Sequence, residues 1–192
     1  MQTIEQANEG AADLYWLAFL LTGHRESSLD VAIEALRFQD GFQNGFQDDF
    51  QDDANPFFST WMLAWSRRVV IAKALAAIRD ELAASGRLTA SKRAQKPAPS
   101  LRNWVLDGRA TKVQLERALL AIDVFPRCAL LLSVFDGMTL EDAAILLGAD
   151  RRLVRKGQTT GLRELTRNLA RMQGWTSTTT NGYVVTSEMQ HA

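Results

Sequence analysis

Four basic side chains near residue 150 could bind a polyanion. They accompany Ala144, Gly148 and Val154, whose spacing is typical of a helix-turn-helix. In such a unit the small alanine lets two helices approach, the glycine supplies a sharp turn, and the valine packs the second helix on the first. Thr139 and Asp150 are the expected N-caps of the two helices. The exposed side chains at the start of the second helix would be Arg151, Arg152, Arg155 and Lys156. A recognition helix contacts DNA at this end, where cations neutralise phosphates and Arg can bind guanine through two hydrogen bonds.

The charge distribution favours a polyanionic partner for the C-terminal part of the chain. The net charge is zero, but residues 1–60 contain 11 acidic and 2 basic side chains, and the rest contains 20 basic and 11 acidic ones. Residues 151–171 alone contain seven basic side chains and one acidic side chain. Opposite charges in the two halves indicate different partners. The alternative is an ordinary helical bundle whose arginines are only solvated.

Catalytic and metal sites have little support in the sequence. The two histidines, His24 and His191, lie in a predicted turn and near the C-terminus, and no Cys–His or His–carboxylate spacing is typical of metal binding or nucleophilic catalysis. A glycine-rich phosphate loop is missing from the sequence. Cys128 lies in an apolar run, which indicates a buried thiol. We therefore expect no enzyme activity, no cofactor and no metal.

The composition is that of a folded protein outside the membrane. Hydrophobic residues make up 46% of the 192 residues, enough for a sizeable core. The apolar runs are far shorter than the roughly 20 residues that span a bilayer. The polar, acidic start MQTIEQANEG is unlike a signal peptide. These features predict a cytoplasmic protein without membrane insertion.

Helical periodicity dominates the chain, and no stretch alternates convincingly as a strand would, so we expect an all-α fold. The expected caps are Ser27 or Ser28 for the second helix, and Ser59 or Thr60 for a long third helix that ends near Ala84. One apolar stripe of the third helix, which we expect to face the core, consists of Trp61, Trp65, Val69, Ala72 and Ala76.

Local signals also mark the C-terminal helices. Thr111 and Gln114 form a capping box at the start of one helix. Pro126 suits the first turn of the next helix, and Gly137 can end it.

The helices group into two expected domains. Residues 1–84 form the first and residues 111–172 the second. Residues 85–110 are rich in Gly, Ser, Pro and basic side chains, which predicts a flexible linker. The polar segment 173–192 is expected to be a disordered tail.

A tetrapeptide repeat, FQDGFQNGFQDDFQDD at residues 38–53, interrupts the first domain. Glycine, aspartate and asparagine between the phenylalanines disfavour both helix and strand, so we expect a low-complexity loop. A calcium site built from its five aspartates is a weak alternative, because the EF-hand pattern is absent. Our hypothesis is that the repeat is an acidic guard that weakens non-specific DNA contact in the free protein.

The second half resembles region four, the C-terminal DNA-binding domain of bacterial RNA polymerase sigma factors, especially the extracytoplasmic-function class. In that family a Leu-Pro and Arg motif precedes an apolar helix, followed by Gly-(Met/Leu)-Ser/Thr-x-Glu-Glu/Asp-x-Ala-x-x-Leu-Gly. The residues that match are Phe125, Pro126, Arg127, Thr139, Glu141, Ala144, Leu147 and Gly148. The first half is similar to region two, through LYWLAFLLTGHRESSLDVAIEAL and WMLAWSRRVVIAKALAAIR. The resemblance covers roughly residues 10–170.

The resemblance implies a role for each half. Asp30 and Glu34 would bind the clamp helices of core RNA polymerase, although Leu29 and Ile33 replace the motif's Glu and Gln. The helix that engages and helps to melt the minus-ten element would contribute Trp61, Arg67 and Arg68. The minus-thirty-five element would be read by Arg151, Arg152, Arg155 and Lys156. Promoter DNA and core polymerase are therefore the expected partners, and an anti-sigma factor is a further candidate.

The recognition helix departs from the family pattern. Gly157 and Gln158 stand where the family has an Arg and a buried Leu, and Thr160 and Leu162 replace basic residues. Gly157 and Gly161 are expected to weaken this helix by about 2 kcal/mol relative to alanine. Two other functions stay open: a free-standing helix-turn-helix regulator, or a sigma-like interaction protein that has lost promoter reading.

Overall fold

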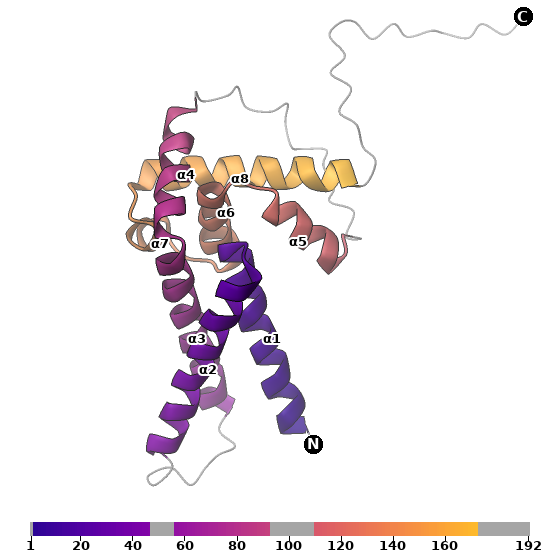
Figure 1. Cartoon of the computed structure of the whole chain (residues 1–192), viewed down its shortest axis with the longest axis vertical. Helices are drawn as coiled ribbons and strands as arrows, with labels where there is room; N and C mark the ends of the chain where they lie inside the picture. Colours follow the sequence, from indigo (N-terminus) through magenta and orange to yellow (C-terminus); the bar gives the residue numbers. More distant parts are fainter. Residues whose placement is uncertain (1, 47–55, 93–109, 173–192) are drawn as a thin grey trace, which may run out of the picture.

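The computed structural model describes residues 2–46, 56–92 and 110–172, and its regular elements in these ranges are all helical (Figure 1). The elements are α1 (Gln2–Thr22), α2 (Arg25–Phe46), α3 (Pro56–Ala77), α4 (Arg79–Ser91), α5 (Lys112–Leu120), α6 (Val124–Leu130), a π-helical turn η2 (Leu131–Phe135), α7 (Leu140–Leu147) and α8 (Arg151–Met172). The predicted all-α class is confirmed for these residues. The division into two domains stays a prediction, and residues 173–192 lie outside the described residues.

Helices α1, α2 and α3 pack against one another in the N-terminal half. Their buried side chains include Leu14, Ala18, Leu21, Val31, Ala35, Val70, Ile71 and Ala74. The turn between α1 and α2 contains Gly23 at φ 78° and a 2.8 Å hydrogen bond between the Thr22 and Ser28 hydroxyls. Because α2 already begins at Arg25, the prediction of Ser27 or Ser28 as its cap is wrong. Ser28 instead stabilises the turn, where its hydroxyl also donates to the carbonyl of His24.

Helix α2 continues into the tetrapeptide repeat. It ends at Phe46, so the prediction of a loop is wrong for residues 38–46, while residues 47–53 lie outside the described residues. Extending an existing helix requires no new nucleus, so this stretch carries the propensity cost of glycine and aspartate but no nucleation cost. The role of the repeat as an acidic guard stays a hypothesis.

Helix α3 faces the core with a different stripe from the predicted one. It begins at Pro56, before the predicted caps, at the first helical position where the missing proline N–H is tolerated. Trp61 and Trp65 are 51% and 43% exposed, so the prediction of a core-facing tryptophan stripe is wrong. The buried residues lie one position further along, at Met62, Ser66, Val70 and Ala74. This four-residue spacing packs small and aliphatic side chains against α1 and α2 and leaves the indoles outside.

Helix α4 was not expected as a separate element. The long third helix breaks at Ile78, whose backbone has φ −109° and ψ 19°, and α4 continues to Ser91. Residues 85–91, assigned to the linker from the sequence, are therefore helical, and Ser85, Gly86 and Thr89 are buried. Helix α4 packs on α6 and α8, where the Ser85 hydroxyl accepts a 3.0 Å hydrogen bond from the Phe125 N–H. The stretch rich in small residues is thus a packed helix end.

Helix α6 lies at the centre of the C-terminal half, and all seven of its residues are buried. Helix α8 crosses α6 at two glycines (Figure 1). A Cβ atom on Gly157 would lie 2.9 Å from Phe125 Cε1, and one on Gly161 would lie 2.6 Å from the Pro126 carbonyl oxygen. The expectation that these glycines merely loosen the helix is therefore replaced by a packing role, since they allow α8 to approach α6.

Arg127 joins the two halves of the chain. Arg127 is 4% exposed, and its side chain donates to the carbonyls of Leu120, the last residue of α5, and of Ile122, just after it. It also donates to the Leu21 carbonyl in the last turn of α1. The distances are 3.3, 3.1 and 3.4 Å. Burial lowers the pKa of Arg127 from its ordinary value. The contiguous core extends across both halves, from Leu14 in α1 to Leu169 in α8.

A second polar contact joins α1 to α5. Trp16 Nε1 donates to Glu116 at 3.1 Å, and the Lys112 ammonium lies 5.0 Å from the centre of the Trp16 ring.

None of the described helices combines the length and apolar character needed to cross a membrane.

Candidate nucleic-acid interface

The turn predicted for the helix-turn-helix is present between α7 and α8. Thr139 caps α7 by accepting the Asp142 N–H at 3.1 Å, as expected. Gly148 ends α7 in the left-handed region at φ 58°, a conformation that favours glycine, and the Ala149 N–H bonds to the Ala144 carbonyl at 3.0 Å. Ala144 itself is half-buried against the core, whereas its neighbour Ala143 is the fully buried small residue of α7.

The start of α8 has an inner and an outer face. Asp150 accepts the Leu153 N–H at 2.8 Å, which confirms the predicted cap. Val154 is completely buried, as the helix-turn-helix spacing requires. On the outside lie three exposed cations, Arg151, Arg152 and Arg155. The expected arginine cluster is therefore solvent-accessible along the first two turns of α8.

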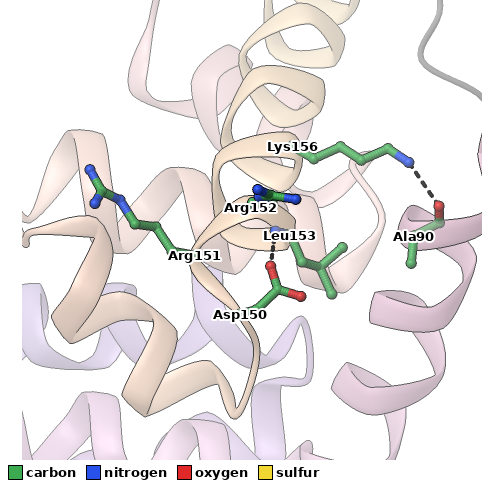
Figure 2. A pocket seen from close by; sticks show the side chains of 6 residues that line it. All are labelled: Ala90, Asp150, Arg151, Arg152, Leu153 and Lys156. Carbon is green, nitrogen blue, oxygen red and sulfur yellow. Dashed lines mark hydrogen bonds between the residues drawn. The ribbon is translucent and has the colours of Figure 1, made fainter.

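The fourth predicted DNA-contacting residue is engaged within the protein. Lys156 is half-buried, and its ammonium donates to the Ala90 carbonyl oxygen at 2.9 Å (Figure 2). It also donates to the Lys92 carbonyl oxygen at 2.6 Å. These carbonyls belong to the C-terminal end of α4. Arg151 points the other way, toward α7, where it forms an exposed 2.8 Å ion pair with Glu141.

An open hollow of about 630 Å³ lies beside this contact, between the end of α4 and the start of α8. Its lining residues are Ala90, Asp150, Arg151, Arg152, Leu153 and Lys156. Figure 2 shows Arg152 and Lys156 on the side that faces α4. This neighbour of α8 is missing from the sequence-based expectation, because the composition of residues 85–110 predicts a linker.

Polar contacts hold the end of α4 in this place. Lys92 forms a 2.9 Å ion pair with Asp123, just before α6, and this hydrogen bond raises the pKa of Lys92. Glu164 of α8 lies near the same pair, and burial together with the Asp123 charge raises the pKa of its carboxyl. Helix α8, the end of α4 and the start of α6 are thus linked by one group of charges.

The predicted minus-ten residues lie on α3. Trp61 and Trp65 stack with ring centres 6.1 Å apart and planes inclined by 23°. Arg67 forms a 2.8 Å ion pair with Asp136, which is only 17% exposed and follows η2, while Arg68 is exposed. The structure therefore brings the two tryptophans together and turns Arg67 toward the C-terminal half.

The predicted polymerase-contacting residues share one face of α2. Asp30 and Glu34 are one turn apart and exposed, and Glu34 also pairs with Lys73 of α3. Leu29 and Ile33, adjacent to them, are 52% and 39% exposed. This face combines apolar and acidic side chains, which suits a protein partner better than DNA.

No cluster of metal-ligating side chains occurs in the parts of the chain that the structure describes. In comparisons with known proteins, no family model, curated protein or solved structure matches the chain.

Proposed function

We propose that the chain is a sigma-type transcription initiation factor, in which α8 reads promoter DNA while the N-terminal helices bind core RNA polymerase. The observation that carries the proposal is the placement of Arg151, Arg152 and Arg155 on the outer face of a capped helix whose inner face is fixed by Val154. Binding to core RNA polymerase would place the chain in the cytoplasm.

The exposed arginines at the start of α8 have the chemistry and spacing to contact a DNA major groove. The groove is about 12 Å wide and accepts a single helix, whose N-terminal residues contact base edges. Arg152 and Arg155 are three residues apart, so they lie on neighbouring positions of one helix face. Both can reach guanine edges or phosphates. Binding of DNA by this face would weaken steeply as the salt concentration rises.

The N-terminal half supplies two further surfaces for the proposed role. The apolar and acidic face of α2, with Leu29, Asp30, Ile33 and Glu34, would bind polymerase. The stacked, exposed Trp61 and Trp65 would accept unstacked bases, because aromatic rings bind single-stranded bases through their faces.

A first experiment tests DNA reading. Duplexes selected by the protein from a random-sequence pool would be bound to variants Arg152→Ala and Arg155→Ala, and affinity measured by fluorescence anisotropy. Each lost base contact should weaken binding by about 1–3 kcal/mol. Arg171→Ala is the matched control, since it removes an exposed arginine from the last turn of the same helix, about 28 Å from Arg152. Equal affinity for all variants would refute the assignment of α8 as the recognition helix.

A second experiment tests the polymerase partner. The tagged protein would be co-purified with core RNA polymerase, and transcription of a genomic DNA library compared with and without it. New discrete start sites that depend on the protein support a working initiation factor. Core binding without new starts would favour a sigma-like interaction protein, and DNA binding without core binding would favour a free-standing regulator.

A further inference from the structure

The end of α4 lies where DNA would have to pass. Lys156, in the second turn of α8, is bound to the carbonyls of Ala90 and Lys92, and Ala90 also lines the hollow beside Arg151 and Arg152. A helix with its side chains is about 10–12 Å in diameter, close to the width of the major groove. Helix α8 therefore cannot enter the groove with the end of α4 still attached to its flank.

Electrostatics oppose the same complex. The C-terminal end of a helix carries a partial negative charge, since its last carbonyls have no intrahelical partners. At the end of α4 two such carbonyl oxygens surround the Lys156 ammonium, as phosphate oxygens would in a DNA complex. Phosphates approaching this face would meet a negative helix end and a lysine that is already satisfied.

The last residues of α4 can withdraw without opening the core. Ala90, Ser91 and Lys92 are exposed, and the buried residues of α4 end at Thr89. The polar contacts to Lys156 and the ion pair from Lys92 to Asp123 hold this end in place. The exposed ion pair contributes little to this attachment, so the hydrogen bonds from Lys156 are the main restraint on these exposed residues.

We infer that residues Ala90–Lys92 form an autoinhibitory clasp, which occupies Lys156 and must withdraw before α8 binds DNA. The inference rests on the proposed function, because it assumes that α8 contacts DNA. It accounts for the neighbouring hollow, which lies between the clasp and the arginines that stay exposed.

Asp123→Asn is the variant that loosens the clasp without replacing any residue of α8. Asp123 precedes α6, and its side chain makes no capping hydrogen bond there, so the substitution removes the ion pair without removing a cap. Affinity for a 5′-labelled duplex of mixed sequence, about 30 base pairs long so that it covers roughly three helical turns, would be measured over a range of salt concentrations. Affinity should rise about two- to five-fold, the effect of losing one exposed ion pair.

Asp80→Asn is the matched control, because it removes the same charge from the exposed first turn of α4, about 18 Å along the helix from Lys92. A rise in affinity with Asp123→Asn beyond that with Asp80→Asn supports the clasp. Equal duplex affinities of the Asp123→Asn and Asp80→Asn variants would overturn the clasp while leaving DNA binding intact. If neither the variants nor the unchanged protein bound any duplex, the proposed function would fail and the clasp would fail with it.

Amide hydrogen exchange gives an independent readout. The Lys92 N–H is bonded to the Leu88 carbonyl at 3.1 Å and therefore reports the last turn of α4. Addition of the duplex to the unchanged protein should accelerate exchange at Lys92. Binding that leaves this amide as protected as before would overturn the clasp, since α4 would then stay in place on the DNA complex.

Discussion

Alanine at Gly161 should destabilise the protein even though alanine is the better helix former. In an exposed helix interior, replacing glycine by alanine stabilises by about 1 kcal/mol. At Gly161, however, the new Cβ would lie 2.6 Å from the Pro126 carbonyl oxygen and 3.1 Å from Leu130 Cβ. The first of these is a backbone atom of a fully buried helix and cannot rotate away.

The magnitude follows from two opposing contributions. Overpacking of a core contact typically costs about 1–3 kcal/mol, and the helix-propensity gain of about 1 kcal/mol offsets part of it. We therefore expect Gly161→Ala to lower the free energy of unfolding by up to about 2 kcal/mol. Gly157→Ala should act in the same direction, because its Cβ would contact Phe125, which is only 2% exposed.

Gly10 provides the matched control. It lies inside α1, and a Cβ there would approach only Leu63 Cδ1, at an ordinary contact distance of 3.7 Å. Urea unfolding followed by circular dichroism should show Gly10→Ala stabilised by about 0.5–1 kcal/mol and Gly161→Ala destabilised. If both substitutions stabilised the protein equally, the argument that α8 needs glycine to approach α6 would be refuted.

Three further predictions concern buried and titrating groups. Arg127→Lys should lower the free energy of unfolding in urea by about 1–3 kcal/mol, because the single nitrogen of lysine cannot occupy the two positions from which the guanidinium nitrogens reach these carbonyls, and unchanged stability would contradict this role. Glu164 has a pKa above its ordinary 4.5, so its protonation stabilises the fold below that pH, and the effect is lost as the pH rises through the folded-state value. Glu164→Gln should therefore show a smaller loss of melting temperature from pH 4 to pH 7 than the unchanged protein, whereas parallel curves would argue against the shift. Burial raises the pKa of Cys128 to about 12, so an aromatic disulfide reagent at pH 8 should label it only after urea unfolding, and rapid labelling of the folded protein would show that the thiol is accessible.

Local chemistry determined the parts of the fold that the sequence could predict. The Thr111 capping box, the Thr139 and Asp150 caps and the turn at Gly148 each depend on residues within a few positions. Such interactions form in almost any surrounding, because the side chain satisfies backbone groups of its own helix.

Tertiary packing decided the features that sequence patterns missed. The exposure of Trp61 and Trp65 depends on which face of α3 meets α1 and α2, and two apolar stripes one position apart were available. Helix propensity alone predicts that Gly157 and Gly161 weaken α8, whereas their role depends on α6, which no local pattern places beside them. Lys156 was expected on the DNA-facing surface because its partners, the carbonyls of α4, carry no side-chain signal in the sequence.

The position of Arg127 couples the energetics of the two halves. Its guanidinium bonds to carbonyls near the ends of α1 and α5, so moving α1 away would leave a buried cation with only part of its hydrogen bonds. A partially desolvated guanidinium is costly, and this cost acts as a shared penalty on any state in which one half opens alone. Stability is therefore a joint property: a substitution that weakens the packing of α1 should also lower the stability of α5, α6 and α8, even where it contacts none of them.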